Sequence, residues 1–417
     1  MAKRRHDHTR GIHNMGGESE GDFPLLTHRF WGLLIFLAVI WLMFFSTFKL
    51  GSYPQQWIEA LMGKFSFFLG QKMQDGWLLD FLQNGIINGI GAVLAFLPNI
   101  LILFFFIFLL EETRYLPRAA KLMDKYMHGI GLHGCSFIPL LMGFGCNVPA
   151  IMATRSIKRR GDRILTMMMI PYIPCSARIP TFLLFSGIFF PRHSTLVMML
   201  LYLGGILTGI VIALINKKIF FREKSEDYET ELPPLRIPNI RAALRGMWSA
   251  ASEYLKKIGT VVLLAVVIVW ALDYFPINEG VPEEEASPSY LHRFGEAVEP
   301  VMAPLGFDWK MSAALIAGIT AKEFIISTLG VLYQESDEEL DTTALSARIA
   351  SDDNINRANA LSFMVFSLLY IPCVATAAVI RRESGSWKWS LISIITTLVV
   401  AWLFAFVTFR IGSLLWQ

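Results

Sequence analysis

The tetrapeptide Tyr-Ile-Pro-Cys occurs twice, at 172–175 and at 370–373, each time within an apolar stretch. A further cysteine, Cys146, lies in a glycine- and proline-rich stretch before the first copy. Thiolates suit borderline or soft ions such as Fe(II), Zn(II) and Cu(I), whereas Mg(II) and Ca(II) prefer oxygen ligands. A lone buried cysteine usually serves as a small apolar filler, but these three all lie beside predicted helix breaks. We therefore predict that Cys146, Cys175 and Cys373 are metal ligands.

The segments that precede the two copies also resemble each other. MGFGCNVPAIM begins at Met142 and AGITAKEFIIS begins at Ala317. Gly143 precedes its copy by 29 positions and Gly318 by 52, and an acidic insert at 334–357 accounts for the difference. Two related halves of opposite polarity, each with discontinuous helices, are the sequence pointer to a transporter site near the bilayer midplane.

Prolines explain why the helices of these segments must break. Pro171, Pro174 and Pro180 fall within ten residues of one apolar run, and each removes a backbone donor and an i−4 hydrogen bond. The freed carbonyls need another partner, which is a neighbouring helix, water or a permeating cation. The residues beside the breaks that we expect to support a path or a gate are Met142, Gly143, Gly145, Asn147, Ser176 and Thr376.

Ionisable residues within the apolar segments give a second signal. Arg178 lies near the middle of 164–190, and Lys322 and Glu323 lie in the middle of 311–333. Such groups cost several kcal/mol against lipid and therefore face a partner or a wet cavity. Neighbouring side chains on a helix do not face each other, so Lys322 and Glu323 do not simply neutralise one another. Two interpretations remain open: an ion pair between the halves, for example Glu323 with Arg178, or a direct role in a path.

The composition excludes an ordinary soluble enzyme. Of 417 residues, 54% are hydrophobic and only 17% are charged, whereas soluble domains carry about a quarter charged residues. The net charge of +3 gives no footprint for nucleic acid. The motifs GxxxxGK[ST] and HExxH do not occur in the sequence, so we expect no enzymatic activity from it.

Apolar stretches long enough to cross a bilayer predict an all-α polytopic membrane protein. They lie at 30–50, 86–110, 164–190, 195–215, 258–272, 358–380 and 389–409. We expect the stretches 134–153 and 311–333, which are rich in Gly, Pro or charge, to be re-entrant or broken and to enter from opposite sides. Basic loops at 154–163, 216–257 and 381–388 predict a cytoplasmic N-terminus.

These motifs resemble a known family. GLHGCSFIPLLMGFGCNVPAIMATR, PYIPCSARIP, PLGFDWKMSAALIAGITAKEF and LLYIPCVATAAVIRRESGSWKW are similar to the membrane portion of the bacterial ferrous iron transport protein B (FeoB) family, over roughly residues 25–412. The resemblance implies two Gate modules with broken helices, and a permease for Fe(II) in the bacterial cytoplasmic (inner) membrane. It also implies that Cys146, Cys175 and Cys373 match the Gate cysteines proposed for the iron path. Fe(II) would be the transported ion, with no tightly bound cofactor.

This interpretation divides the chain into five parts. We expect a basic cytoplasmic tail at 1–27, a first transmembrane helix and interfacial segment at 28–83, a first Gate module at 84–220, a cytoplasmic linker at 221–257, and a second Gate module at 258–417 with acidic loops at 273–310 and 334–357.

The sequence departs from the family pattern in one respect. The family normally carries an N-terminal G-protein domain, whereas only 27 residues precede the first span here. Either the GTPase is a separate polypeptide, or it was removed, or this member works without it. The partners that this interpretation names are a separate cytoplasmic GTPase or a small regulatory protein, membrane lipid, and further copies of the chain in a homo-oligomer. Three alternatives remain open: a carrier of Mn, Zn or Co, a nucleoside-type solute carrier, and a non-transporting membrane partner of a GTPase.

Overall fold

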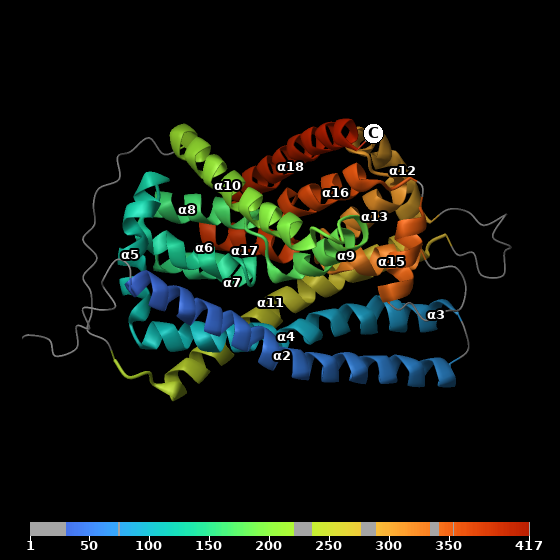
Figure 1. The fold of residues 1–417 in the computed structure, drawn as a ribbon. Coiled ribbons are helices and arrows are strands. Elements are labelled where there is room, and N and C mark those ends of the chain that lie inside the picture. Colours follow the sequence, from blue (N-terminus) through green and yellow to red (C-terminus); the bar gives the residue numbers. More distant parts are fainter. Residues whose placement is uncertain are drawn as a thin grey trace, which may run out of the picture.

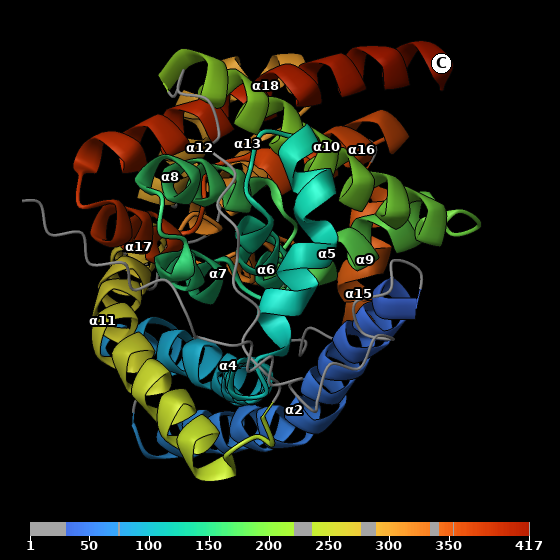
Figure 2. The ribbon, with the colours of Figure 1, turned by 90° about the vertical axis from the view of Figure 1, so that its left-hand side faces the viewer.

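The computed structural model describes residues 31–73, 76–220, 236–276, 289–333, 342–352 and 354–416. Every regular element among these residues is a helix. Three long helices lie together along one side of the molecule and the remaining helices pack above them (Figures 1 and 2). These three are α2 (Trp31–Lys72), α4 (Asn88–Glu112) and α11 (Ile240–Tyr274), and α4 contacts both of the others.

The stretch 51–83, predicted as an interfacial segment, is largely helical. Helix α2 runs without interruption to Lys72, and it is followed by α3 (Trp77–Asp80) and the π-helix η1 (Phe81–Ile87). The polar groups that suggested an interface find partners on these neighbours. Asn99 donates a hydrogen bond to Gln55 over 2.8 Å, and Gln83 donates to the carbonyl of Ser66 over 2.8 Å. Because its polar groups are satisfied by packing, this stretch continues the helix.

The first half of the molecule follows α4 as a series of short helices and one long one. In chain order these are α5 (Tyr115–Gly129), η2 (Gly134–Ser136), α6 (Phe137–Gly143), α7 (Asn147–Ala153), η3 (Thr154–Ser156), α8 (Arg160–Met169), η4 (Ile170–Tyr172), η5 (Ser176–Arg178), α9 (Ile179–Phe189) and α10 (Ser194–Phe220).

The second half follows α11 in a similar order. Its elements are α12 (Tyr290–Met302), η6 (Ala303–Leu305), α13 (Trp309–Ala317), α14 (Phe324–Leu332), α15 (Thr342–Ser351), α16 (Arg357–Leu369), α17 (Val374–Ser384) and α18 (Trp387–Leu415). The pairs α6–α7 and α13–α14 correspond in the two halves, as do α8–α9 and α16–α17. Helices α10 and α18 then close each half.

Two predicted loops and the predicted linker are partly helical. The linker at 221–257 overlaps α11, which begins at Ile240 after the N-cap Asn239, whose side chain accepts from two backbone N–H groups. The acidic loop 273–310 contains α12, capped by the side chain of Ser289, and the acidic loop 334–357 contains α15. Helix α15 (TTALSARIAS) contains no acidic residue and α12 contains only Glu296 and Glu299, so both helices form in the less acidic parts of these stretches; α12 packs on α13.

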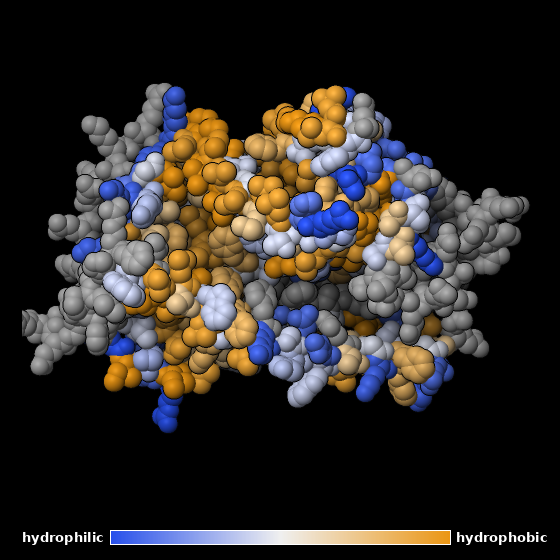
Figure 3. All heavy atoms as spheres, viewed as in Figure 1, coloured by the Kyte–Doolittle hydropathy of each residue, from blue (hydrophilic) through white to orange (hydrophobic). Residues whose placement is uncertain are grey.

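Five helical stretches among the described residues are long and apolar enough to cross a membrane by length and composition. They are Leu34–Lys72, Arg160–Phe189, Ser194–Phe220, Arg357–Ser384 and Trp387–Leu415. Hydrophobic side chains cover much of the face seen in Figure 3, as a bilayer requires. Two of the stretches, Arg160–Phe189 and Arg357–Ser384, contain the Tyr-Ile-Pro-Cys copies and are interrupted there.

Candidate functional site

Two interruptions face each other in the first half. Helix α6 ends at Gly143, and Cys146 has the extended conformation (φ −149°, ψ 133°) before α7 begins. Helix α8 passes through η4 into an extended segment in which Cys175 has φ −81° and ψ 163°. Ser176 joins the two breaks, because its N–H and its hydroxyl donate to the carbonyl of Gly145 over 3.2 and 2.8 Å. The prolines of the second break thus free backbone groups that the first break satisfies.

The second half repeats this arrangement. The chain unwinds between α13 and α14, and again at Tyr370–Cys373 between α16 and α17, where Cys373 has φ −56° and ψ 152°. The N–H of Val374 donates to the carbonyl of Ile319 over 3.0 Å. Val374 follows its cysteine as Ser176 follows Cys175. A similar backbone link therefore ties the two breaks together in both halves, with the acceptor carbonyl shifted by one position between them.

A buried cation caps the freed carbonyls in each half. Arg178, which is 1% exposed, donates to the carbonyl of Pro171 over 3.3 and 3.4 Å and to that of Ile173 over 3.5 Å. Lys322, which is 3% exposed, donates to the carbonyl of Ile371 over 2.7 Å. Ile173 and Ile371 hold the same place in the two tetrapeptides. Each half thus uses a cation to hold the break open at an equivalent carbonyl.

These contacts decide against one sequence-based interpretation. An ion pair between Glu323 and Arg178 was one of two open possibilities. The Nη1 and Nη2 groups of Arg178 instead donate to the carbonyls of Pro171 and Ile173 in its own break. The carboxylate of Glu323 accepts a hydrogen bond from its own backbone N–H and interacts electrostatically with the neighbouring Lys322, and its side chain keeps partial exposure. Glu323 is therefore the charged group of the site that is left open to a mobile partner.

The three predicted cysteines gather around this carboxylate. Cys146 interacts electrostatically with Cys175, Cys373 and Glu323, and Cys175 with Cys373 and Glu323. Each thiol keeps partial exposure although the residues beside it are largely buried. Within the described part of the chain, no three His, Cys, Asp or Glu side chains lie close enough to hold a metal ion together. The thiols thus form a loose group around an accessible space, without a coordination shell.

The remaining predicted residues lie around this group. Met142 is 4% exposed and belongs to the apolar cluster against which Cys146 and Cys373 pack. The hydroxyl of Thr376 lies 3.1 Å from the sulfur of Cys373. Asn147 is 5% exposed, and its side-chain oxygen has no hydrogen-bond partner among the described residues.

The predicted glycines serve close packing. A Cβ at Gly143 would lie 3.4 Å from the side chain of Ile173, and one at Gly145 would lie 2.8 Å from Leu103. In the second half, a Cβ at Gly318 would lie 2.5 Å from the hydroxyl of Tyr370. A larger residue at Gly145 would therefore require Leu103 of α4 to move and one at Gly318 would require Tyr370 to move, whereas a Cβ at Gly143 would make ordinary van der Waals contact.

Two contributors were missed by the sequence analysis. The ammonium of Lys322 lies 3.3 Å from the ring centroid of Tyr370, a cation–π contact. The repeated tetrapeptide draws attention to Tyr370, but it does not indicate Lys322 as its partner. Arg155, after α7, donates to both carboxylate oxygens of Glu383, at the end of α17, over 2.7 and 2.5 Å. The partners are 228 positions apart, and no local pattern in the sequence links them.

Comparison with known proteins places these elements in context. Residues 93–189 and 255–387 match the family described as Gate, nucleoside recognition. Residues 198–249 match the family described as Ferrous iron transport protein B C terminus. No significant match to a solved structure was found.

Full-length relatives show the same likeness. The chain is 44% identical to an "Fe(2+) transport protein A/Fe(2+) transporter FeoB fusion protein" of Porphyromonas gingivalis, over 94% of this chain and 51% of the relative. It is 40% identical to the "Fe(2+) transporter FeoB" of Campylobacter jejuni, over 94% of this chain and 65% of the relative. A Staphylococcus aureus protein of that name is 37% identical over 94% of this chain and 58% of its own length. The chain thus spans about half to two thirds of the length of these relatives.

Proposed function

We propose that this chain, which belongs to the FeoB family and corresponds to its membrane (Gate) portion, is a permease that carries ferrous iron across the bacterial inner membrane. The names of its relatives supply the ion, since three of them are called Fe(2+) transporters. One observation in the molecule supports the proposal: a partly exposed carboxylate, Glu323, interacts with Cys146 and Cys175 where four helices are unwound.

We infer that Fe(II) passes between the two halves, in contact with Cys146, Cys175 and Cys373 in turn. Fe(II) is a borderline ion that accepts thiolate and oxygen ligands. Conduction requires sites that bind weakly enough to release the ion to the next site. The loose grouping of the thiols, with Glu323 and unwound backbone nearby, supports successive weak contacts rather than one tight cage.

We also infer that the two halves are inverted relative to each other. Contacts between the halves pair α7 with α17 and α14 with α9, and exchanging the halves converts one pair into the other. The loop between α7 and α8 at 154–163 holds five basic residues, whereas the equivalent stretch at 334–357 holds two. Since short basic loops stay in the cytoplasm, these equivalent loops lie on opposite sides. Inversion then brings both pairs of breaks to the middle of the bilayer.

Uptake of Fe(II) by proteoliposomes tests the proposal. The purified chain is reconstituted with an Fe(II)-sensitive dye inside the vesicles, with and without a soluble G-protein partner. We expect the variant in which Cys146, Cys175 and Cys373 are all serine to transport at least about tenfold more slowly, because oxygen replaces the softer ligand. Cys135→Ser is the matched control and should transport normally.

The same assay separates the alternatives. Mn(II), Zn(II), Co(II) and nucleosides are added as competitors at equal concentration. Competition by nucleosides alone would favour a solute carrier, consistent with the description of the Gate family. Unchanged uptake in the triple serine variant would remove the thiols from the path.

A further inference from the structure

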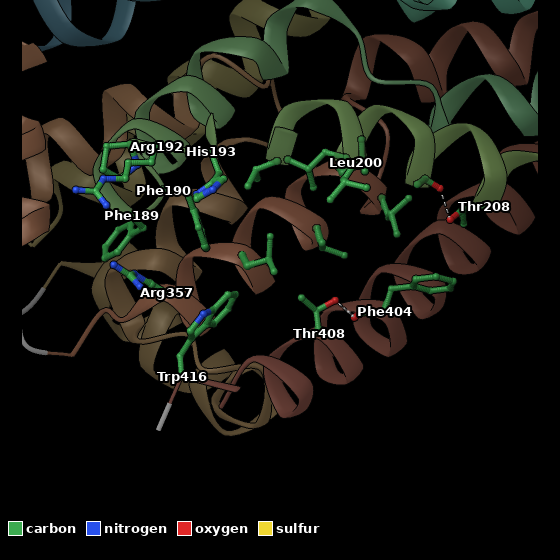
Figure 4. Close-up of a pocket in the computed structure, with 18 residues that line it drawn as sticks. Phe189, Phe190, Arg192, His193, Leu200, Thr208, Arg357, Phe404, Thr408 and Trp416 are labelled. Atoms are coloured by element: carbon green, nitrogen blue, oxygen red, sulfur yellow. Dashed lines mark hydrogen bonds between the residues drawn. The ribbon is translucent and has the colours of Figure 1, made fainter. Parts of the chain in front are cut away.

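A long groove lies between α10, α16 and α18 (Figure 4). It encloses about 800 Å3, within the range of about 300–1,000 Å3 typical of ligand pockets. The loop between α9 and α10 closes one end. Several of its side chains are open to the exterior: Leu200 is 58% exposed, Phe404 is 50% exposed and Trp416 is 42% exposed.

The length of the groove matches one leaflet of a bilayer. Its lining runs from Val197 to Thr208 on α10 and from Arg357 to Leu369 on α16, which correspond to about 16 and 18 Å of helix at 1.5 Å per residue. The hydrocarbon core of a whole bilayer is about 30 Å thick. An occupant that lies along the groove thus extends from one surface of the membrane to near its middle.

The walls of the groove are apolar along most of this length. Leucine and valine side chains of α10 and α16 make up the wall in its middle part. The hydroxyls of Thr208 and Thr408 donate to the carbonyls of Gly204 and Phe404 on their own helices, each over 2.7 Å (Figure 4). The hydroxyl hydrogens of both threonines are therefore already donated within their own helices, and the mainly apolar wall suits a hydrocarbon chain.

The closed end of the groove is cationic. Arg192, His193 and Arg357 gather there beside Trp416 (Figure 4). None of the three basic side chains has a hydrogen bond or ion pair with a residue that the structure describes. This end is opposite the basic ends of the same helices, which carry Lys217 and Lys218 on α10 and adjoin Arg381 and Arg382 before α18. The positive charge at the closed end of the groove would therefore attract an anion at this surface of the membrane.

We propose that this groove binds one anionic phospholipid, with an acyl chain between α10, α16 and α18 and the phosphate at Arg192 and Arg357. A phospholipid in the bilayer already has the required orientation, because its negatively charged headgroup lies at the membrane surface and its acyl chains point toward the membrane centre. Trp416 has the amphipathic ring that favours the headgroup level. The arginine pair can donate to phosphate oxygens with the fork geometry that suits them.

The bound chain would touch the back of both Tyr-Ile-Pro-Cys breaks. Leu368 and Leu369, which line the groove, directly precede Tyr370. On α10, a Cβ at Gly205 would lie 2.7 Å from the carbonyl of Tyr172. The lipid would therefore lie against the helices that carry the breaks, without entering the path between the halves.

Native mass spectrometry of the full purified chain tests this site directly. The protein is titrated with phosphatidylglycerol or with phosphatidylcholine of the same acyl chains, and the bound fraction is measured for the first lipid. We expect tighter binding of phosphatidylglycerol. The double variant Arg192→Gln/Arg357→Gln should lose on the order of tenfold in this affinity, because basic residues near an anionic headgroup each contribute about fivefold.

A second variant tests the hydrocarbon part of the groove. Gly204 lines it, and a Cβ there meets no atom within 4 Å, so Gly204→Leu fills the groove without a clash. The affinity of this variant for both lipids should fall by about tenfold or more, because the leucine side chain takes the place of the acyl chain in the groove. Gly187→Leu is the matched control: a Cβ at Gly187 also meets open space, but Gly187 lies outside the groove.

The outcomes decide the proposal without reference to transport. Arg410→Gln removes an exposed charge from the same part of α18 outside the groove, and it should bind both lipids as the unaltered chain does. Equal binding of the two lipids, or an unchanged affinity in either the arginine double variant or Gly204→Leu, would overturn the proposal. Loss of affinity in Gly187→Leu to the same extent would do so as well.

Discussion

The two halves of the molecule solve one physical problem with different residues. In each, proline leaves carbonyls of an unwound tetrapeptide without helical partners, and a buried cation caps them. In the first half the cation is Arg178, three residues after Cys175 in the same break. In the second half that position is Thr376, and Lys322 reaches over from the facing break instead. The requirement for a cation is thus shared, while its origin in the chain is not.

The difference changes what each half offers to an ion. When MGFGCNVPAIM and AGITAKEFIIS are aligned without a gap, Cys146 matches Ala321, Asn147 matches Lys322 and Val148 matches Glu323. The first half therefore contributes two thiols and an unpaired amide oxygen, and the second half contributes one thiol and a carboxylate. The two halves therefore differ in the ligand types that they contribute around the four breaks.

The largest effect should come from the first half. Arg178→Ala removes a fully buried side chain, so it leaves a cavity and uncaps the carbonyls of Pro171 and Ile173. We expect a loss of about 3–5 kcal/mol in the free energy of unfolding, as for other large buried side chains. Unfolding in bicelles measures it, with the exposed Arg410→Ala as control. Equal stability of the two variants would mean that the cap does not hold the break.

The second half should respond less. Lys322→Met keeps most of the side-chain volume but leaves the carbonyl of Ile371 without its donor, at a cost of about 1–3 kcal/mol. Lys322→Arg retains a donor and should recover part of this loss. A loss for Lys322→Met as large as that for Arg178→Ala would abolish the difference between the halves. The exposed Lys388→Met serves as the control.

A third prediction concerns the contacts between the halves. Arg155 and Glu383 join the α7 and α17 ends, whereas no ion pair joins the equivalent α14 and α9 ends among the described residues. A double-mutant cycle with Arg155→Ala and Glu383→Gln isolates this pair from other contacts of Arg155. We expect a coupling of about 1 kcal/mol, because Arg155 is half exposed, and a smaller value at 1 M salt. A coupling energy of zero would mean that the Arg155–Glu383 pair does not stabilise the contact between α7 and α17.

The smallest effect should be on pH dependence at the other end. Burial by itself raises the pKa of Asp352, but the hydrogen bonds from the Tyr333 hydroxyl, over 2.7 Å, and the Asn354 N–H outweigh it and lower this pKa below its usual range. A lowered pKa adds stability at pH values above the unfolded-state pKa of about 4. That contribution disappears as the pH falls through the lowered value.

Asp352→Asn makes this prediction measurable. The stability difference between the unaltered chain and the variant should be constant at neutral pH and should shrink as the pH is lowered below about 4. A difference that stays constant throughout, or one that grows in acid, would show that the Tyr333 contact does not depend on the carboxylate. Glu112→Gln, with an exposed carboxyl at the end of α4, is the control.

The sequence was sufficient to place the helix breaks. Proline spacing around Cys175 and the glycines before Cys146 predict where helices end, because the loss of a backbone donor is a local property. All the breaks expected around the three cysteines are present in the structure. The composition likewise predicts membrane-spanning helices, since hydrophobic length is read directly from the chain.

Charge patterns predicted less. The acidic stretches 273–310 and 334–357 were expected to be loops, yet they contain α12 and α15. The polar residues at 51–83 suggested an interfacial segment, yet α2 continues through much of it. In each case a polar residue is compatible with either state, and the neighbour that packs against it decides between them.

The residue types and the local backbone breaks were determined by the sequence alone: proline, glycine and cysteine act on the few residues around them. The partners of the buried charges were decided only by the tertiary structure. Lys322 finds its carbonyl 49 positions away and Arg155 finds its carboxylate 228 positions away. Such contacts form when distant segments pack together, and their energy depends on a distance that no local pattern records.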